Sequence, residues 1–371
     1  MTSSGKIQVG VVFGGRSGEH QVSLISAQSI IKALDPEKYQ VIPIGVTKHG
    51  SWLVGADPKL MLSGPDEKNR LQMHTSKAVV GDPTHKGMVL LNSPDTNERV
   101  KLDIVFPVIH GTYGEDGTLQ GLLELADIPY VGCGVLASSV GMDKTATKKI
   151  LRDAGLPIGN FLEVLRKDWK SNQEETISLI EENFTYPCFI KPVNSGSSVG
   201  VSKARDRNQL IEAMNLAGKY DRKILIEEYI DGREIEVSVL GNDDPIASMP
   251  GEITPCNEFY DYNAKYIDNK SELSIPAKMS DEQIEKTKEL AVKAFRAIDG
   301  AGMARVDFFL ERKTGRLLIN ELNTIPGFTN ISMYPKLWEA SGISYPELVN
   351  RLIDLALERH AEKQESLKSV I

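Results

Sequence analysis

The chain has 371 residues, of which 41% are apolar and 25% charged, and its formal net charge is −8 at pH 7. This composition is ordinary for a globular protein of two or three domains, and the negative charge excludes a nucleic-acid binder that works through a broad positive field. No apolar run approaches the roughly 18 residues of a membrane span, and no signal-peptide pattern precedes the first apolar run. The three cysteines have no metal-like spacing and fit a reducing compartment. We therefore expect a cytoplasmic protein with no nucleic-acid partner and no membrane partner.

The first third of the chain alternates predicted strands with predicted helices. Short apolar runs indicate strands at 7–13, 39–46, 104–109 and 130–131. Apolar residues at helical spacing follow between 22 and 34, and again from about 119. Such alternation predicts a doubly wound parallel sheet. The stretch from about 54 to 98 is polar and irregular, and we interpret it as an insertion.

The loop after the first predicted strand is glycine-rich and begins with Gly14 and Gly15. It lacks the G-x-G-x-x-G spacing of dinucleotide-binding folds, and the second strand ends in Thr47-Lys48 instead of an acidic residue, so an NAD-linked enzyme is disfavoured. The glycines either make a tight turn or bring backbone N–H groups and a helix N-terminus to an anion such as a carboxylate. Glu19 is then either a surface residue at a helix start or the acceptor of a substrate ammonium.

A change in composition predicts a domain boundary near residue 140, with Asp143 as the N-cap of the next helix. After a helix at 173–183, an apolar strand ends in Lys191, passes through a loop of small residues and enters another strand. This is not a Walker A loop, in which the lysine follows the glycines. The segment is either a flexible surface hairpin or a phosphate-covering loop that binds through backbone N–H groups and Lys191.

Two further strands, at 223–230 and 234–240, carry Glu227, Glu234 and Glu236. These carboxylates either recognise the amino and ribose groups of a nucleotide or form the polar face of a half-buried sheet.

The polar stretch 252–276 contains several aromatic residues and Lys265. A loop of this length within a compact domain is usually functional, so the stretch predicts a lid. Helices are expected at 281–298 and near 345–359, the latter followed by a polar tail.

Apolar runs at 306–310 and 317–322 predict a β-hairpin. Polar residues interrupt these runs at Arg305, Asp307, Asn320, Glu321 and Asn323. Residues two apart on a strand share a face, so Asp307, Glu321 and Asn323 converge as oxygen donors if the two faces coincide. Oxygen ligands suit Mg²⁺ held against phosphates, and Arg305 beside them offsets developing negative charge. The alternative is an exposed hairpin with one salt bridge, from Arg305 to Asp307 or to Glu321.

Taken together, the phosphate-covering hairpin, the lysines at 144 and 265 and the oxygen ligands predict an ATP-dependent, Mg²⁺-dependent enzyme of non-P-loop type.

The motifs and their order resemble the ATP-grasp superfamily and, within it, the D-alanine–D-alanine ligases. The resemblance runs nearly end to end and rests on the following segments: Gly14-Gly-Arg-Ser-Gly-Glu-His-Gln-Val-Ser23, His110-Gly-Thr-Tyr-Gly-Glu-Asp-Gly-Thr118, Met142-Asp-Lys144, Lys191-Pro with Gly-Ser-Ser-Val-Gly200, Tyr260-Asp-Tyr-Asn-Ala-Lys-Tyr266, Ala304-Arg-Val-Asp307 and Asn320-Glu-Leu-Asn-Thr-Ile-Pro-Gly-Phe-Thr329.

The resemblance implies a combined α/β and α+β fold, with a doubly wound parallel-sheet domain followed by two ATP-grasp subdomains whose sheets are largely antiparallel. We expect an N-terminal substrate domain at 1–140, a central subdomain with the phosphate-covering loop at 141–226, and a C-terminal subdomain with the metal site and lid at 227–371. It also implies a homodimer.

The implied activity is the ATP-dependent joining of two D-alanine molecules through an acyl phosphate. The implied ATP-binding residues are Lys144, Lys191, Ser197, Ser198, Glu227, Glu228, Tyr229, Ile230, Glu234 and Lys265. The implied ligands of two Mg²⁺ ions, with Mn²⁺ as an alternative, are Asp307, Glu321 and Asn323. The implied substrate-binding residues are Glu19, His110, Arg305, Gly327 and Ser332, and the implied catalytic residues are Glu19, Ser197, Tyr266, Arg305 and Gly327.

Tyr266 also bears on the choice of the second substrate. In relatives that make D-alanyl-D-lactate the lid departs from the Ala-Lys-Tyr pattern, so the retained Tyr266 predicts dipeptide formation. A non-catalytic nucleotide sensor with the same fold is the alternative, and the complete set of lysines and metal ligands disfavours it.

Overall fold

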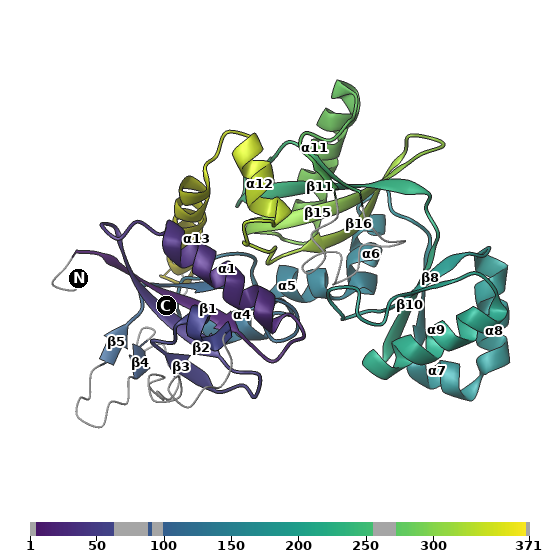
Figure 1. Ribbon diagram of the computed structural model, residues 1–371, viewed down its shortest axis with the longest axis horizontal. Helices are drawn as coiled ribbons and strands as arrows, with labels where there is room; N and C mark the ends of the chain where they lie inside the picture. Colours follow the sequence, from purple (N-terminus) through teal and green to yellow (C-terminus); the bar gives the residue numbers. More distant parts are fainter. Residues whose placement is uncertain (1–4, 63–87, 91–98, 255–271, 369–371) are drawn as a thin grey trace.

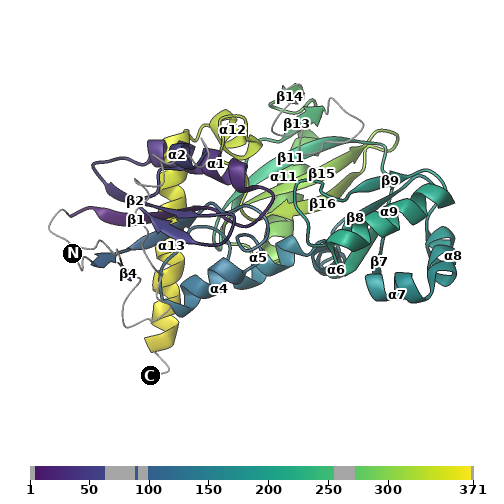
Figure 2. The same cartoon turned by 60° about the horizontal axis from the view of Figure 1, so that its bottom comes forward.

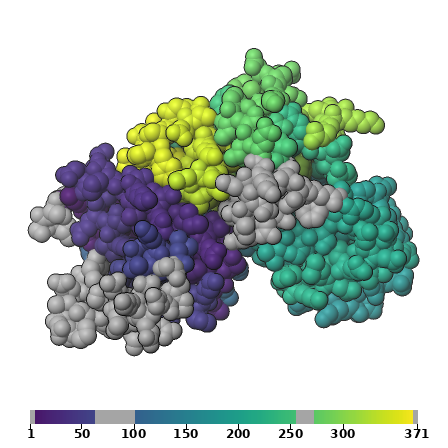
Figure 3. All heavy atoms as spheres, viewed as in Figure 1, coloured from purple at the N-terminus to yellow at the C-terminus, as the bar shows by residue number. Residues whose placement is uncertain are grey.

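Three lobes, each with its own β-sheet, follow one another along the chain (Figure 1). The computed structural model describes residues 5–62, 88–90, 99–254 and 272–368. In the space-filling view the purple N-terminal lobe and the teal middle lobe lie at opposite ends, with the green and yellow C-terminal part between and above them (Figure 3). This arrangement agrees with the predicted combination of α/β and α+β architecture.

The N-terminal sheet has the strand order β3-β2-β1-β6. Strands β1, β2 and β6 are parallel and β3 is antiparallel to β2, so the predicted parallel sheet carries one antiparallel edge strand. The strands are β1 Ile7–Gly14, β2 Tyr39–Val46, β3 Trp52–Val54 and β6 Ile104–Pro107, and the helices are α1 His20–Ala33, α2 Pro58–Leu62 and α4 Thr118–Leu125. Because both faces of β1 are covered, its residues from Gln8 onward are buried, as the continuous apolar run predicted.

Two expectations for this lobe were wrong in detail. The strand expected at 130–131 is a single parallel bridge between Val105 and Tyr130, because Gly132 turns the chain at a φ of 94° directly afterwards. The insertion is not wholly irregular either, since β4 Met88–Leu90 pairs antiparallel with β5 Arg99–Lys101.

The middle lobe is an antiparallel sheet of order β7-β10-β8-β9, covered by helices on one side (Figures 1 and 2). Its strands are β7 Phe161–Leu165, β8 Cys188–Pro192, β9 Ser202–Ala204 and β10 Lys223–Glu228, and its helices are α7 Arg166–Ser171, α8 Gln173–Asn183 and α9 Arg207–Tyr220. Strands β8 and β9 form the predicted hairpin, and α8 has the predicted bounds. Elements β7 and α7 were not anticipated from the sequence.

The C-terminal sheet has the order β14-β13-β11-β15-β16, with β12 beside β11. Its strands are β11 Gly232–Gly241, β12 Ile246–Ala247, β13 Gly251–Thr254, β14 Glu272–Ser274, β15 Gly302–Glu311 and β16 Leu317–Asn323. The helices α5 Val135–Met142, α6 Lys144–Asp153 and α11 Asp281–Ala297 share one apolar core with this sheet. The two ends of the predicted lid form the β13–β14 pair, and residues 255–271 lie outside the described part.

Helices α12 Met333–Ala340 and α13 Tyr345–Lys368 close the described chain. Helix α13 continues well past the expected end at 359 and passes along the N-terminal lobe (Figure 2). Its residues Leu348 and Leu352 join the core of the N-terminal sheet with Val9 and Phe106. The chain thus returns to its first lobe. The domain limits at 140 and 226 stay a prediction.

Candidate active site

A cavity of about 440 Å³ opens where the three lobes meet. It is lined by all the predicted site residues that the structure describes: Glu19, His110, Lys144, Lys191, Ser197, Ser198, Glu227, Glu228, Tyr229, Ile230, Glu234, Arg305, Asp307, Glu321, Asn323, Gly327 and Ser332. Lys265 and Tyr266 lie outside the described residues.

The β15–β16 hairpin brings its polar residues to one face. Its register sets Asp307 opposite Glu321 and Arg305 opposite Asn323, as the sequence pattern required. The Arg305 guanidinium donates to both Asp307 oxygens, at 2.7 Å each, and Asn323 Nδ2 donates to Asp307 Oδ2 at 3.0 Å. The salt bridge between Arg305 and Asp307 that the alternative interpretation expected is therefore present. The hairpin is not exposed there, however, since both side chains are largely buried in the cavity wall.

A second carboxylate contacts Arg305. Glu236 on β11 lies opposite Asp307 in the sheet register, and its Oε2 is 2.9 Å from Arg305 Nε. The sequence offered Glu236 either as a nucleotide-binding carboxylate or as part of a polar strand face, and neither interpretation anticipated its ion pair with Arg305. Because Arg305 contacts two carboxylates, it keeps one anionic partner when the other binds something else.

The chemistry of the hairpin residues fits Mg²⁺. Asp307 and Glu321 supply carboxylate oxygens and Asn323 an amide oxygen, which are donors that this ion prefers. Within the described residues, no group of three or more His, Cys, Asp or Glu side chains could hold a metal by itself. The donor set is therefore short of ligands that nucleotide phosphates would supply.

Two lysines converge on one buried carboxylate in the cavity wall. Lys148 Nζ lies 2.6 Å from Glu227 Oε1, and Lys191 Nζ lies 2.7 Å from Glu227 Oε2. Burial raises the pKa of the Glu227 carboxyl, but the two ammonium groups outweigh this effect and lower the pKa to about 2. Burial likewise lowers the pKa of Lys191, and the Glu227 carboxylate raises it above its ordinary value. Glu227 and Lys191 are therefore both charged at neutral pH.

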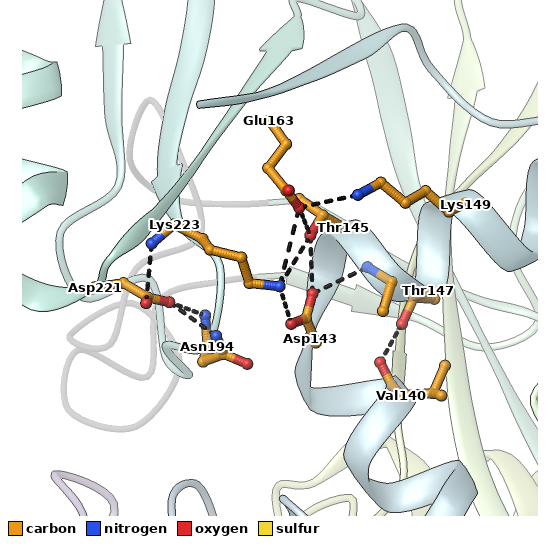
Figure 4. Close-up of polar contacts among 10 residues, drawn as sticks. Val140, Asp143, Thr145, Thr147, Lys149, Glu163, Asn194, Asp221 and Lys223 are labelled. Carbon is orange, nitrogen blue, oxygen red and sulfur yellow. Dashed lines mark hydrogen bonds and ion pairs between the residues drawn. The ribbon is translucent and has the colours of Figure 1, made fainter. Parts of the chain in front are cut away.

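The start of α6 is fixed by polar contacts to the middle lobe (Figure 4). Asp143 caps the helix by accepting from the Ala146 N–H at 2.9 Å, and Lys223 Nζ donates to the same carboxylate. The Thr145 hydroxyl lies within hydrogen-bond distance of both the Asp143 and the Glu163 carboxylate (Figure 4). These contacts hold the adjacent Lys144, whose ammonium donates to Ser195 O in the β8–β9 loop at 2.8 Å.

The tip of the β8–β9 loop reaches the N-terminal lobe. Ser197 Oγ donates to Glu19 Oε1, so one contact joins the phosphate-covering loop to the loop after β1. Ser197 has a φ of 49°, in the left-handed region. Gly196 permits the approach, because a Cβ there would lie 2.6 Å from Glu19 Oε2. Gly111 is equally close to that carboxylate, since its Cβ would lie 2.7 Å away.

His110 is buried behind this contact. Its Nδ1 donates to Ile325 O at 3.0 Å, and its Nε2 lies 3.2 Å from Ser26 Oγ, which also accepts from Phe328 N at 3.1 Å. Burial lowers the pKa of the imidazole, but Glu115, with Glu19 and the Ile325 carbonyl, raises it above its ordinary value on balance. Through its hydrogen bond to Ile325 O, His110 joins the N-terminal lobe to the turn after β16.

That turn presents Gly327 and Ser332 to the cavity. Ser332 Oγ accepts from the Thr329 N–H at 3.0 Å. A Cβ on Gly327 would lie 2.7 Å from Ser332 Oγ, so the two residues are in close contact. The Gly327 backbone and the Ser332 hydroxyl therefore lie side by side at this end of the site.

On the far side of the cavity, Phe189 and Tyr229 stack with centroids 6.3 Å apart, and Lys203 lies over the Tyr229 ring at 4.1 Å. Glu228 accepts from the Asn160 N–H at 2.7 Å. This corner of the site offers aromatic faces and backbone groups of the kind that accommodate a flat ring.

Comparison with known proteins places this cavity in a family. The chain matches the family described as D-ala D-ala ligase N-terminus over residues 8–133 and the one described as D-ala D-ala ligase C-terminus over residues 150–354. The chain belongs to the D-alanine–D-alanine ligase family.

Relatives in this family match nearly the whole chain. A D-alanine–D-alanine ligase of Acetivibrio thermocellus is 53% identical over 96% of this chain and 97% of its own length. One of Heliobacterium modesticaldum is 51% identical over 97% of each chain. Each is long enough to include every motif described above.

Solved structures of the ligase family have the same fold. The D-alanine–D-alanine ligase from Coxiella burnetii has a TM-score of 0.85 at 36% identity and covers 98% of both chains. VanG D-Ala:D-Ser ligase from Enterococcus faecalis has a TM-score of 0.83 at 36% identity, covering 95% of this chain and 99% of its own. Overall similarity to these two structures therefore does not distinguish the second substrate.

The sequence did not indicate Lys148 as a residue of this ligase-family site, and it did not indicate the pairing of Glu236 with Arg305. Lys148 follows Lys144 by four positions, so both lie on one face of α6, and this spacing was the available signal. Glu236 follows Glu234 by two positions on a strand, which puts both on one face. Its pairing with Arg305 required knowledge of the strand order.

Proposed function

We propose that this chain joins two D-alanine molecules into D-alanyl-D-alanine through an acyl phosphate, releases ADP and phosphate, and thereby supplies a precursor for peptidoglycan and cell-wall synthesis. The observation that carries the proposal is the meeting of Glu19, Ser197 and Arg305 in one cavity, in a chain that is 53% identical to a D-alanine–D-alanine ligase over nearly its whole length.

In the first step, a carboxylate oxygen of one D-alanine attacks the γ-phosphorus of ATP, and the bond from that phosphorus to ADP breaks. Glu19 receives the ammonium of this D-alanine, since its carboxylate borders the cavity and Ser197 orients it. Lys144 and Lys191 bind the α- and β-phosphates, and Lys265 binds the γ-phosphate. The acyl phosphate supplies the leaving group that amide formation otherwise lacks.

In the second step, the amine of the other D-alanine attacks the acyl carbon, the C–O bond to phosphate breaks and the amine loses a proton. Arg305 and the Gly327 N–H stabilise the tetrahedral oxyanion. Ser332 binds the carboxylate of this second D-alanine. His110 supports the substrate end of the site from behind, through Ile325 and Ser26.

The nucleotide base lies at the aromatic end of the cavity. Glu227 and the backbone of Tyr229 and Ile230 bind adenine, and Glu234 binds the ribose. Glu228 and Ser198 complete the ATP-binding wall.

Asp307, Glu321 and Asn323 would hold two Mg²⁺ ions, or Mn²⁺ in their place. The ions would neutralise phosphate charge during transfer. Arg305 already occupies both Asp307 oxygens, so we expect these residues to bind the metal together with the nucleotide.

The second substrate is the finer choice. VanG is named as a D-Ala:D-Ser ligase, and Tyr266, on which we base dipeptide formation from two D-alanines, lies outside the described residues.

The protein is proposed to act in the cytoplasm and as a homodimer; sedimentation equilibrium would test the dimer. None of the described helices is long and apolar enough to cross a membrane.

The test is phosphate release by the purified protein with ATP and Mg²⁺. D-Alanine is added alone or with D-serine or D-lactate, L-alanine serves as control, and products are identified by mass. We expect release that depends on D-alanine and yields the dipeptide. A preference for D-lactate or D-serine near neutral pH would overturn the assignment of the second substrate. Bound ATP without any release would indicate a nucleotide sensor instead.

A further inference from the structure

The lysine–glutamate cluster in the cavity wall holds one positive charge more than its carboxylate can neutralise. Lys148 and Lys191 each contact one oxygen of Glu227, at 2.6 and 2.7 Å. Within this cluster of three, the sum is one excess positive charge. Phosphate groups that enter the cavity are natural partners for this excess positive charge.

The two lysines differ in their freedom to reach a ligand. The Lys148 side chain is only 4% exposed, on a helix that packs into the C-terminal core, whereas the Lys191 side chain is 16% exposed at the end of β8. The carboxylates of Glu321 and Glu234 also lie close enough to Lys191 to raise its pKa. Lys191 is therefore the more accessible of the two lysines and lies near the carboxylates of the C-terminal sheet, whereas Lys148 is almost fully enclosed.

When Lys191 turns to a phosphate, Glu227 loses one partner. A buried carboxylate left with no partner is strongly destabilising, because neither water nor a cation replaces the lost interaction. With Lys148 in place the carboxylate keeps an ion pair of 2.6 Å. Glu227 then remains charged and oriented as a hydrogen-bond acceptor for the base.

We propose that Lys148 is a positioning residue: it is the permanent counter-ion of Glu227, and it thereby releases Lys191 to bind the phosphates of ATP. The inference rests on the proposed function, in which Lys191 and Glu227 bind the nucleotide. Lys148 itself touches neither phosphate nor substrate.

The test compares Lys148→Met with Lys148→Arg and with a matched control, Lys149→Met. Lys149 is the next residue, is 51% exposed and pairs with Glu163, which is not a member of the cluster; Figure 4 shows this pair. In Lys148→Met, Lys191 is the remaining partner of Glu227, so ATP must compete with that pair. We expect the Kd for ATP and the KM for ATP to rise at least tenfold, while the KM for D-alanine stays within threefold. Lys148→Arg and Lys149→Met should stay within threefold of the wild type for ATP.

Adenosine separates positioning from general damage to the pocket. It has no phosphates and does not require Lys191, so its Kd should stay within threefold in Lys148→Met. Equal losses for adenosine and ATP would show a purely structural role, and an unchanged Kd for ATP would show no role; either result overturns the proposal.

A measurement on the wild-type protein covers the case in which Lys148→Met does not fold. With lysine labelled at Cε, NMR should show the Lys191 signal shifting on addition of ATP while the Lys148 signal stays in place. Movement of the Lys148 signal, or none at Lys191, would contradict the inference. A protein that binds no ATP at all would instead refute the proposed function.

Discussion

Gly196 offers a test of the contact between the phosphate-covering loop and the substrate ammonium site. Its φ lies outside the left-handed region, so alanine fits the backbone, but the new Cβ would lie 2.6 Å from Glu19 Oε2 and 3.3 Å from Glu19 Cδ. Ordinary contacts begin near 3.4 Å. In Gly196→Ala the Glu19 carboxylate must therefore move away by about 0.8 Å, the difference between the 2.6 Å contact and the 3.4 Å at which ordinary contacts begin.

This displacement acts on a charge-assisted hydrogen bond, the one that Ser197 donates to Glu19. Such a bond contributes about 1.5–3 kcal/mol, and each 1.4 kcal/mol corresponds to a factor of about 10 in affinity. If Glu19 receives the first D-alanine, the KM for that substrate should rise about 10- to 100-fold in Gly196→Ala. Nucleotide affinity should change less than threefold.

The assay is steady-state phosphate release at varied D-alanine, with the Kd for ATP measured separately by calorimetry. Gly18→Ala is the matched control, because Gly18 directly precedes Glu19 and a Cβ there meets no atom within 4 Å. An unchanged KM for D-alanine in Gly196→Ala would refute the role of Glu19. A loss of ATP affinity as large as the loss for D-alanine would show that the loop itself, and not Glu19, is disturbed.

Three further predictions concern other parts of the protein. Glu236→Gln removes the anionic partner that Arg305 keeps once the metal takes Asp307, so kcat should fall about tenfold while the Kd for Mg²⁺–ATP, measured by calorimetry, stays within threefold; a weaker Kd with unchanged kcat would contradict this. Because the pKa of His110 is raised in the folded protein, protonation of His110 stabilises the fold; this stabilisation is complete below the unfolded pKa near 6.5 and is lost as pH rises through the folded pKa. Glu115→Gln should therefore lower the pKa of His110 in an NMR titration, and an unchanged pKa would refute the contribution of Glu115. Asp299 has a φ of 61° after α11, so Asp299→Gly should raise the free energy of unfolding by about 1 kcal/mol in denaturant unfolding, with activity unchanged; a destabilised variant would show that Asp299 makes a contact worth more than its strain.

Much of the fold followed from local patterns in the sequence. The apolar run of β1, the bounds of α8 and the β15–β16 hairpin depend on residues close together in the chain, where periodicity and turn residues determine the element. The polar interruptions of that hairpin were equally informative. Asp307 and Glu321 interrupt apolar strands, and the register does bring them opposite each other.

The features that were missed depend on contacts between distant segments. Glu236 meets Arg305 only because β11 pairs with β15, and no local pattern specifies that pairing. Lys148 resembles any polar residue on an amphipathic helix until Glu227, on β10, is placed against it. Short elements such as α5 and β7 have too few residues for a clear period, and tertiary packing decides their conformation.

The return of α13 to the first lobe has a consequence for how the protein is made. Leu348 and Leu352 complete an apolar core whose other members, Val9 and Phe106 among them, emerge much earlier from the ribosome. Domains usually fold as units during synthesis, N-terminal first, but here the face of the N-terminal sheet that α1 covers in part stays incompletely covered until α13 has been translated. Nascent chains that stall before α13 would therefore expose apolar surface, and a chaperone that covers β1 and β6 would bind them in preference to the finished enzyme.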